Sequence, residues 1–155
     1  MSAELKTESY ETTEPDFSAV LEQAENIISL KGGRFTAIRK HVYQLLLKAP
    51  HPLGAYEIID QLNGIGAQKP PTVYRALTWL IEHGLVAKIA YNARYVVLPI
   101  GVEPDNLAFV ICRKCGDTGT VETPGISKSL HQTAKDRGFQ PTETVIEIIG
   151  LCDGH

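Results

Sequence analysis

The chain carries two short pairs of metal-binding residues, and their positions restrict how its C-terminal third can fold. Cys112 and Cys115 form a C-x-x-C pair after an apolar run, and Cys152 and His155 form a C-x-x-H pair that lies 36 residues beyond it. Two such pairs are typical of a closed tetrahedral zinc site, which leaves no open position for catalysis. The fold must therefore bring residues 112–115 and 152–155 together.

The unit around these pairs is small enough to need such a crosslink. Residues 106–155 number about 50, fewer than an apolar core alone stabilises comfortably. A structural zinc contributes about 10–16 kcal/mol of apparent binding energy to small zinc peptides at pH 7. Three thiols cannot all pair in disulfides, and a cytosolic environment keeps thiols reduced. We therefore expect one structural Zn²⁺ per chain, held by Cys112, Cys115, Cys152 and His155.

Two other interpretations of these residues stay open at this point. His155 is the least secure ligand, because a terminal residue can fray and its own carboxylate competes for the metal. A redox role for Cys112 and Cys115 is disfavoured, because a redox C-x-x-C usually opens a helix, whereas this one leads into a turn and a strand.

Charge is distributed unevenly along the chain. The net charge is −3 overall, but residues 31–94 hold nine basic groups against three acidic ones, while residues 1–16 hold five acids against one lysine. A basic block inside an acidic chain is typical of a domain that binds a polyanion, although a solvated basic face without a partner gives the same pattern. Residues 1–16 are predicted to be a disordered acidic tail.

Apolar periodicity predicts the elements of the N-terminal domain. Helical spacing of apolar residues predicts four helices, at residues 17–30, 37–48, 54–62 and 72–82, with Thr36 as the cap of the second. Two β-rich runs then follow at 85–90 and 94–98 as a hairpin. In the fourth helix the residues expected to be buried are Val73, Leu77, Leu80 and Ile81. These elements in this order predict a winged helix-turn-helix over residues 17–98.

A second, smaller domain is predicted after a proline- and glycine-containing hinge at residues 99–105. Strands are expected at 107–112, 118–122 and 144–151, and a helix at 126–137, so residues 106–155 form a zinc-stapled α/β domain. The fold class is therefore α+β, with a winged helix-turn-helix domain first and a small α/β domain second. No apolar run reaches the ~18 residues of a membrane span, and the first residues are not a secretion signal. We expect a cytoplasmic protein without a membrane partner.

The fourth helix carries the residues best suited to reading DNA. A major groove about 12 Å wide admits one helix, whose first turns meet the base edges. Tyr74, Arg75 and Thr78 lie there, where an arginine can pair with guanine and a tyrosine ring can pack on a thymine methyl group. Phosphate contacts are expected from Arg34, Arg39, Lys40, Lys69, Lys88 and Arg94. The alternatives are a half-buried Tyr74, packed on Leu53 or Tyr56, and a solvated Arg75.

Five segments, taken in order, resemble the ferric uptake regulator (Fur) family of bacterial metalloregulators, and most closely its zinc-uptake branch. They are residues 33–39 (GRFTAIR), 52–60 (PLGAYEIID), 69–77 (KPPTVYRAL), 109–116 (FVICRKCG) and 145–152 (VIEIIGLC). The resemblance implies a homodimeric DNA-binding repressor with a C-terminal dimerisation domain, which reads AT-rich inverted repeats when metal is bound. It matches Tyr74 and Arg75 to the family's recognition pair, and Cys112, Cys115 and Cys152 to its structural zinc ligands. His155 stands where the family usually has a fourth cysteine.

The chain departs from the family at the second, metal-sensing site between the two domains. The two wing positions that supply ligands in the family are Ala87 and Leu98 here, and residues 103–108 contain no histidine. The donors that remain nearby are Glu103, Asp105, Glu122, His51 and His83, an oxygen-rich set that binds zinc or ferrous iron weakly. We therefore expect a degraded sensing site and assign no sensing ligands.

These observations predict a DNA-binding transcriptional regulator and not an enzyme, with double-stranded DNA and a second copy of the chain as partners and no small-molecule substrate. The main alternative is a zinc-stapled interaction module that pairs with another family member without reading DNA itself. Charge reversal at Arg75 separates the two, because only the DNA reader would lose function.

Overall fold

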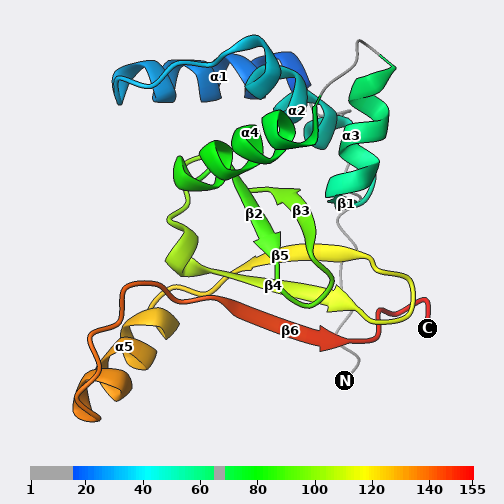
Figure 1. The fold of residues 1–155 in the computed structure, drawn as a ribbon. Helices are drawn as coiled ribbons and strands as arrows, with labels where there is room; N and C mark the ends of the chain where they lie inside the picture. The colour runs from blue at the N-terminus through cyan, green and yellow to red at the C-terminus, as the bar shows by residue number, and fades with distance from the viewer. Residues whose placement is uncertain (1–15, 65–68) are drawn as a thin grey trace, which may run out of the picture.

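The computed structural model describes residues 16–64 and 69–155, which form helices packed on two small sheets (Figure 1). This mixed architecture confirms the predicted α+β class. The N-terminal half contains α1 (Phe17–Leu30), α2 (Ala37–Lys48), β1 (Leu53–Gly54), α3 (Ala55–Asn63), α4 (Pro70–Glu82), β2 (Val86–Ile89) and β3 (Arg94–Val97). The C-terminal half contains η1 (Pro104–Asn106), β4 (Leu107–Cys112), β5 (Thr118–Glu122), α5 (Ile126–Asp136) and β6 (Ile146–Gly150).

The four N-terminal helices and the first sheet enclose one large apolar core. The buried side chains of α1, α2, α3 and α4 meet those of β1, β2 and β3 in this cluster. Tyr43 is completely buried there, and within the described residues its hydroxyl has no hydrogen-bond partner. The acidic tail predicted for residues 1–16 lies outside the described residues except for Asp16. The Asp16 carboxylate accepts hydrogen bonds from the Ser18 and Ala19 amides at 3.1 and 3.3 Å and so caps α1.

Three predictions for the second and fourth helices differ from the structure. The fourth helix begins at Pro70 and not at residue 72, because proline is well tolerated in the first turn of a helix. Ile81 is 38% exposed, because it lies at the edge of the apolar stripe whose centre holds Val73, Ala76, Leu77 and Leu80. Thr36 precedes α2, but its side chain makes no capping hydrogen bond.

The short strand β1 was not expected from the sequence, and it completes a three-stranded sheet in the order β1-β3-β2. Leu53 and Gly54 pair antiparallel with Tyr95 and Arg94 of β3. The third helix consequently starts at Ala55, one residue later than predicted, because Gly54 is taken up by the strand. The wing, which is the hairpin of β2 and β3, is thereby joined to the segment between α2 and α3.

The second sheet has the order β5-β4-β6, with β4 in the middle. β4 pairs antiparallel with β5 and parallel with β6, in a register that places Cys112 opposite Gly150. The parallel pairing makes both strands end at the same edge of the sheet, so the segments after β4 and after β6 emerge side by side. The last strand begins at Ile146 and not at residue 144, because Ile146 is the first residue of this segment that pairs with β4. The Thr144 hydroxyl is hydrogen-bonded to His131 of α5.

The two halves of the molecule meet through the wing. Ile89 and Leu98 from the wing region pack against Leu107, Phe109 and Ile111, which lie on one face of β4. In Figure 1 the β2–β3 hairpin accordingly lies between the helices and the second sheet. Among the described helices, none is long and apolar enough to cross a membrane.

Candidate metal centre and nucleic-acid interface

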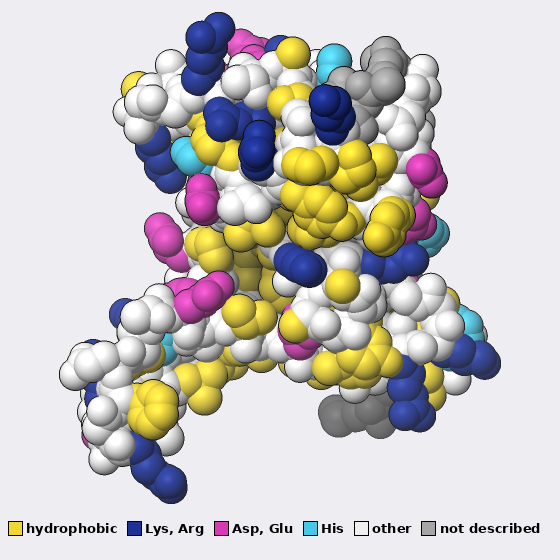
Figure 2. Space-filling view, viewed as in Figure 1, with side chains coloured by type: hydrophobic (Ala, Val, Ile, Leu, Met, Phe, Trp, Pro, Cys, Tyr) yellow, Lys and Arg dark blue, Asp and Glu magenta, His cyan; other side chains and the backbone are white. Residues whose placement is uncertain are grey.

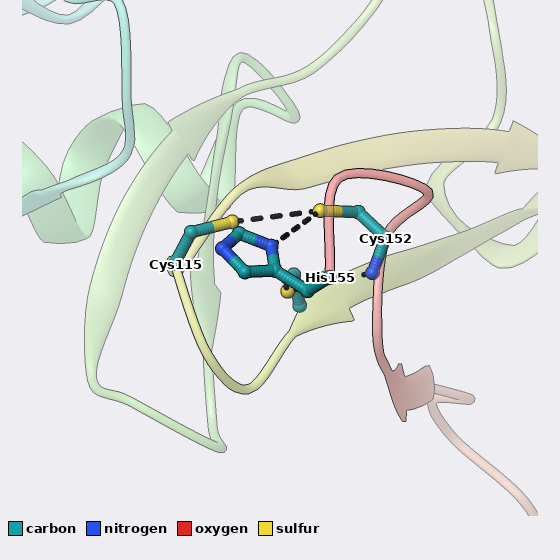
Figure 3. Close-up of side chains that lie close together, drawn as sticks. Cys115, Cys152 and His155 are labelled. Atoms are coloured by element: carbon teal, nitrogen blue, oxygen red, sulfur yellow. Dashed lines mark hydrogen bonds between the residues drawn. The ribbon is translucent and has the colours of Figure 1, made fainter.

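The four predicted zinc ligands lie together at the edge of the second sheet. The Cys115 and Cys152 sulfurs are 3.7 Å apart, and His155 Nδ1 lies 3.1 Å from the Cys152 sulfur and 4.0 Å from the Cys112 sulfur. Figure 3 shows Cys115, Cys152 and His155 pointing toward one another. All four ligand atoms lie within 4.8 Å of one another. Zn–S bonds of ~2.3 Å give a tetrahedron with edges of about 3.7 Å, so this donor set fits a zinc ion.

Local backbone structure explains why the first pair is presented in this way. Cys112 ends β4, and the chain then turns so that the Gly116 amide donates to the Cys112 carbonyl at 2.8 Å. Gly116 has φ +78°, a left-handed conformation that favours glycine. The Cys112 amide donates to the Asp117 carbonyl at 2.8 Å, and β5 then begins at Thr118. Cys112 and Cys115 therefore flank one tight turn.

Backbone amides surround the sulfur of Cys112. Hydrogen bonds from the amides of Cys115, Cys152 and Lys114 lower the pKa of the Cys112 thiol to about 6. The pKa of Cys152 is raised: the Gly154 amide lowers it, but the neighbouring Cys112 and Cys115 sulfurs together with burial outweigh that bond. At neutral pH the turn therefore already favours one thiolate, which is the form that binds metal.

The remaining candidate donors do not form a second cluster. Across residues 16–64 and 69–155, the cysteines and His155 make the one group of at least three Cys, His, Asp or Glu side chains close enough to share an ion. His83 ends α4, stacks on Trp79 with ring centroids 4.0 Å apart, and places Nδ1 2.8 Å from the Trp79 carbonyl. His51 is exposed, and Glu103, Asp105 and Glu122 join no such group.

The first turns of α4 present the predicted reading residues to solvent. Tyr74 is 42% exposed, and Arg75 and Thr78 are exposed as well. The Thr78 hydroxyl donates to the Tyr74 carbonyl at 2.9 Å, one turn back along the same helix. Tyr74 lies near Tyr95, whose pKa is raised by burial and by the charge of Tyr74. The exposed part of the Tyr74 side chain is therefore available to a ligand.

Some of the predicted phosphate-binding residues are exposed, and others contact groups within the protein. Arg34 and Lys69 are exposed just before α2 and α4. The Arg39 guanidinium instead lies 4.1 Å from the centre of the Trp79 ring and donates to the Arg34 carbonyl at 2.7 Å. Figure 2 shows several Lys and Arg side chains over the N-terminal helices and others lower on the same face of the molecule.

Two further predicted phosphate contacts have acidic partners within the protein. Lys40 pairs with Glu25 of α1 at 2.6 Å. Arg94 pairs with Glu57 at 2.9 Å and donates to the Pro52 carbonyl at 2.8 Å, while Glu57 also accepts from the Gly54 amide. Arg94 thus holds β3 against the start of α3, a structural role that its place on the wing did not reveal.

One exposed aromatic residue was missed by the sequence interpretation. Tyr56 lies in the first turn of α3 and is 79% exposed. α3 packs directly against α4. A single tyrosine at a helix start, between Ala55 and Glu57, adds little to an apolar pattern, so this exposed ring leaves no signal in the sequence.

The chain is similar to known metalloregulators over nearly its whole length. Residues 30–149 match the model of the ferric uptake regulator family. The zinc uptake regulation protein of Escherichia coli (strain K12) is 36% identical over 135 residues, which cover 86% of this chain and 79% of that protein.

Two solved structures share the fold closely. A zinc uptake regulator complexed with zinc and DNA has a TM-score of 0.84 and 33% identity, with 90% of this chain and 94% of that chain covered. The crystal structure of holo XcZur has a TM-score of 0.81 and 33% identity, with 88% and 96% covered. Because these values span both halves of the molecule, the likeness includes the way the halves are placed relative to one another.

Proposed function

Because the chain belongs to the ferric uptake regulator family of transcriptional regulators, we propose that it is a zinc-containing repressor that binds double-stranded DNA as a homodimer. Members of this family are regulators and not enzymes. The observation that carries the proposal is the exposed Tyr74–Arg75 pair in the first turns of α4. Such a helix start is the part of a helix-turn-helix that meets base edges.

The proposed contacts follow from side-chain chemistry and exposure. Arg75 pairs bidentately with a guanine, and the Tyr74 ring packs on a thymine methyl group, with Thr78 one turn further along the groove. Arg34 and Lys69 bind phosphates, because both are exposed just before a helix. Arg39 supports the recognition helix from α2, since its guanidinium already lies over the ring of Trp79, which belongs to α4.

Exposed apolar side chains support a homodimer. Most of the large exposed apolar residues that the structure describes lie in the C-terminal half, namely Val121, Ile126, Leu130, Phe139, Val145, Ile148, Ile149 and Leu151. Many exposed large apolar side chains in one small domain are typical of an interaction site. We propose residues 106–155 as the dimerisation domain, 17–98 as the DNA-binding domain and 99–105 as the hinge. A dimer would then place two recognition helices about one turn of DNA apart, ~34–36 Å.

The zinc in this proposal is structural. Cys112, Cys115, Cys152 and His155 supply four ligands, and a full tetrahedral shell leaves no position for exchange with a signal. The ion would connect the turn after β4 with the segment after β6. Loss of the ion would therefore destabilise the parallel pairing of β4 and β6 in the proposed dimerisation domain.

The usual sensing site is proposed to be degraded. Ala87 and Leu98 carry no ligand atoms, and the acidic and histidine side chains around them do not gather into a cluster within the described residues. A regulator of this kind binds its operator without needing a second metal. In a bacterial cell it would act in the cytoplasm, where its DNA is.

The test combines a metal count with operator binding. The full-length protein is purified with its zinc, an AT-rich inverted repeat is selected from a random duplex pool, and affinity is measured as zinc is added. We expect one zinc per chain and an affinity that changes less than about twofold. Two tightly bound metals and a large gain in affinity would overturn the degraded-sensor proposal. If Arg75→Glu left operator binding unchanged, the assignment of Arg75 as a base-reading residue would fail; if the wild-type protein selected no duplex at all, the interaction module would be favoured.

A further inference from the structure

One acidic residue of the second sheet reaches across to the wing. The Glu147 carboxylate accepts hydrogen bonds from two successive backbone amides at the end of β2: Oε1 from Ala90 at 2.6 Å and Oε2 from Tyr91 at 3.0 Å. Both oxygens are therefore used, one for each amide. Two consecutive N–H groups that converge on one anion form a cradle of the kind that binds carboxylates and phosphates.

The strand register explains why Glu147 points at the wing. In the parallel pair, Glu147 lies opposite Phe109 of β4, so the two side chains share a face of the sheet. Phe109 belongs to the apolar cluster that joins β4 to Ile89 and Leu98 of the wing region. Glu147 therefore lies beside the apolar contact between the halves and adds a polar bond to it.

The contact has two properties that suit a positioning element. Hydrogen bonds to an ionised carboxylate are shorter and stronger than those between neutral groups. The bonds also join residues that are 56 and 57 positions apart in the sequence and belong to different halves of the molecule. An apolar contact can slide, because it has no direction, whereas two hydrogen bonds to one carboxylate fix both a distance and an orientation.

We propose that Glu147 is a positioning residue that fixes the orientation of the DNA-binding half relative to the second sheet, and thereby sets the operator spacing that the protein accepts. This inference rests on the proposed function, since it concerns the spacing of two recognition helices in a dimer. It provides a metal-independent way to hold the halves in a DNA-binding arrangement, in a chain whose metal-sensing positions are occupied by Ala87 and Leu98.

The first test measures the contact itself and needs no DNA. Amide hydrogen exchange at Ala90 and Tyr91 is compared in the zinc-loaded wild-type protein, in Glu147→Gln and in Glu143→Gln. Glu143 is the matched control, because it is exposed, is close in sequence, and makes no hydrogen bond or ion pair within residues 16–64 and 69–155. Glu147→Gln should speed exchange at both amides about tenfold, since the charge and one acceptor are lost. Equal rates in all three proteins would overturn the proposal.

The second test measures how strongly DNA affinity depends on the spacing between the two half-sites. A duplex selected by the wild-type protein is altered by inserting or deleting one or two base pairs between its half-sites. Wild type and Glu143→Gln should bind the altered duplexes at least about tenfold more weakly than the selected one, and Glu147→Gln should reduce that preference to about threefold or less. Affinity for a single half-site should be the same in all three proteins. An unchanged spacing preference, or a loss of half-site affinity in Glu147→Gln, contradicts the positioning role.

The two tests keep this inference separate from the proposed function. If no inverted repeat is selected by the wild-type protein, the repressor proposal fails, and the spacing claim fails with it. The exchange experiment still decides whether Glu147 holds the wing. If a repeat is selected but exchange at Ala90 and Tyr91 does not respond to Glu147→Gln, the repressor proposal stands and the inference is wrong.

Discussion

Replacing Cys152 by serine should unfold the second sheet while the N-terminal core stays folded. Cys152 lies in the middle of the cluster, with its sulfur 3.7 Å from that of Cys115 and 3.1 Å from His155 Nδ1. If ~10–16 kcal/mol of apparent zinc binding energy is shared among four ligands, each contributes roughly 2.5–4 kcal/mol. The variant should therefore bind zinc about 100- to 1000-fold more weakly, so a chelator that leaves the wild-type protein loaded will strip the variant.

The structural consequence follows from the sizes of the two cores. The total zinc contribution is as large as the net stability of a typical domain, about 5–15 kcal/mol, so the second sheet cannot stay folded after the metal is lost. The helical core is a separate and much larger cluster and does not depend on the ion. Amide exchange should then become fast throughout β4 and β6, while α2 and α4 remain protected.

The matched control for this variant is His155→Cys. It keeps four ligands and replaces the exposed imidazole with a thiolate, which zinc accepts equally well, so zinc content and β4 protection should equal those of the wild type. The measurements are zinc per chain by elemental analysis and residue-resolved exchange at matched chelator concentrations. Full protection of the β4 amides in metal-free Cys152→Ser protein would refute the argument.

Three further predictions concern the N-terminal half. Arg75→Ala should weaken operator binding by ~1–3 kcal/mol. Lys69→Ala should weaken binding to all duplexes by a similar factor and reduce the slope of log affinity against log salt concentration by about 1. Titrations at several salt concentrations separate the two effects. Burial raises the pKa of Tyr43 to about 12, so the free energy of unfolding of the wild-type protein should be constant below pH 10 and fall by up to about 2–3 kcal/mol as the pH rises to 12. Urea titrations should show a smaller fall in Tyr43→Phe. Below pH 10 this variant should be as stable as the wild type, because the buried hydroxyl has no partner in the described part of the chain. Arg94→Met should lower the free energy of unfolding by about 1–3 kcal/mol, because it removes the bonds to Glu57 and to the Pro52 carbonyl, and half-site affinity should stay unchanged.

Much of the fold could be predicted because its elements are specified locally. Helices with long apolar stripes, such as α1 and α2, begin and end at the predicted residues. The two-residue strand β1 could not be predicted, because Leu53 and Gly54 become a strand only through pairing with β3. The late start of β6 has the same kind of origin, since the strand begins only at Ile146, the first residue that pairs with β4.

In the candidate sites, too, some features could be predicted from the sequence and others depend on tertiary contacts. The clustering of Cys112, Cys115, Cys152 and His155 was predictable because Cys and His in such pairs have few other uses in a small domain. Basic residues have many uses, and the sequence alone does not distinguish an arginine that faces solvent from one that binds inside the protein. Arg75 is exposed, whereas Arg39 stacks on Trp79 and Arg94 pairs with Glu57. The bond from Glu147 to the wing depends on the register of two strands and on backbone amides, which leave no mark in the sequence pattern.

The position of Trp79 gives this molecule an intrinsic fluorescent probe. It is the single tryptophan of the chain, it lies on α4 next to Thr78, and its ring contacts Phe35, Arg39 and His83. Because the Arg39 guanidinium of α2 lies over this ring, the environment of the indole depends on the contact between α2 and α4. A duplex that draws the Arg39 guanidinium away from the ring would change the emission, so DNA binding could be followed in real time without a label.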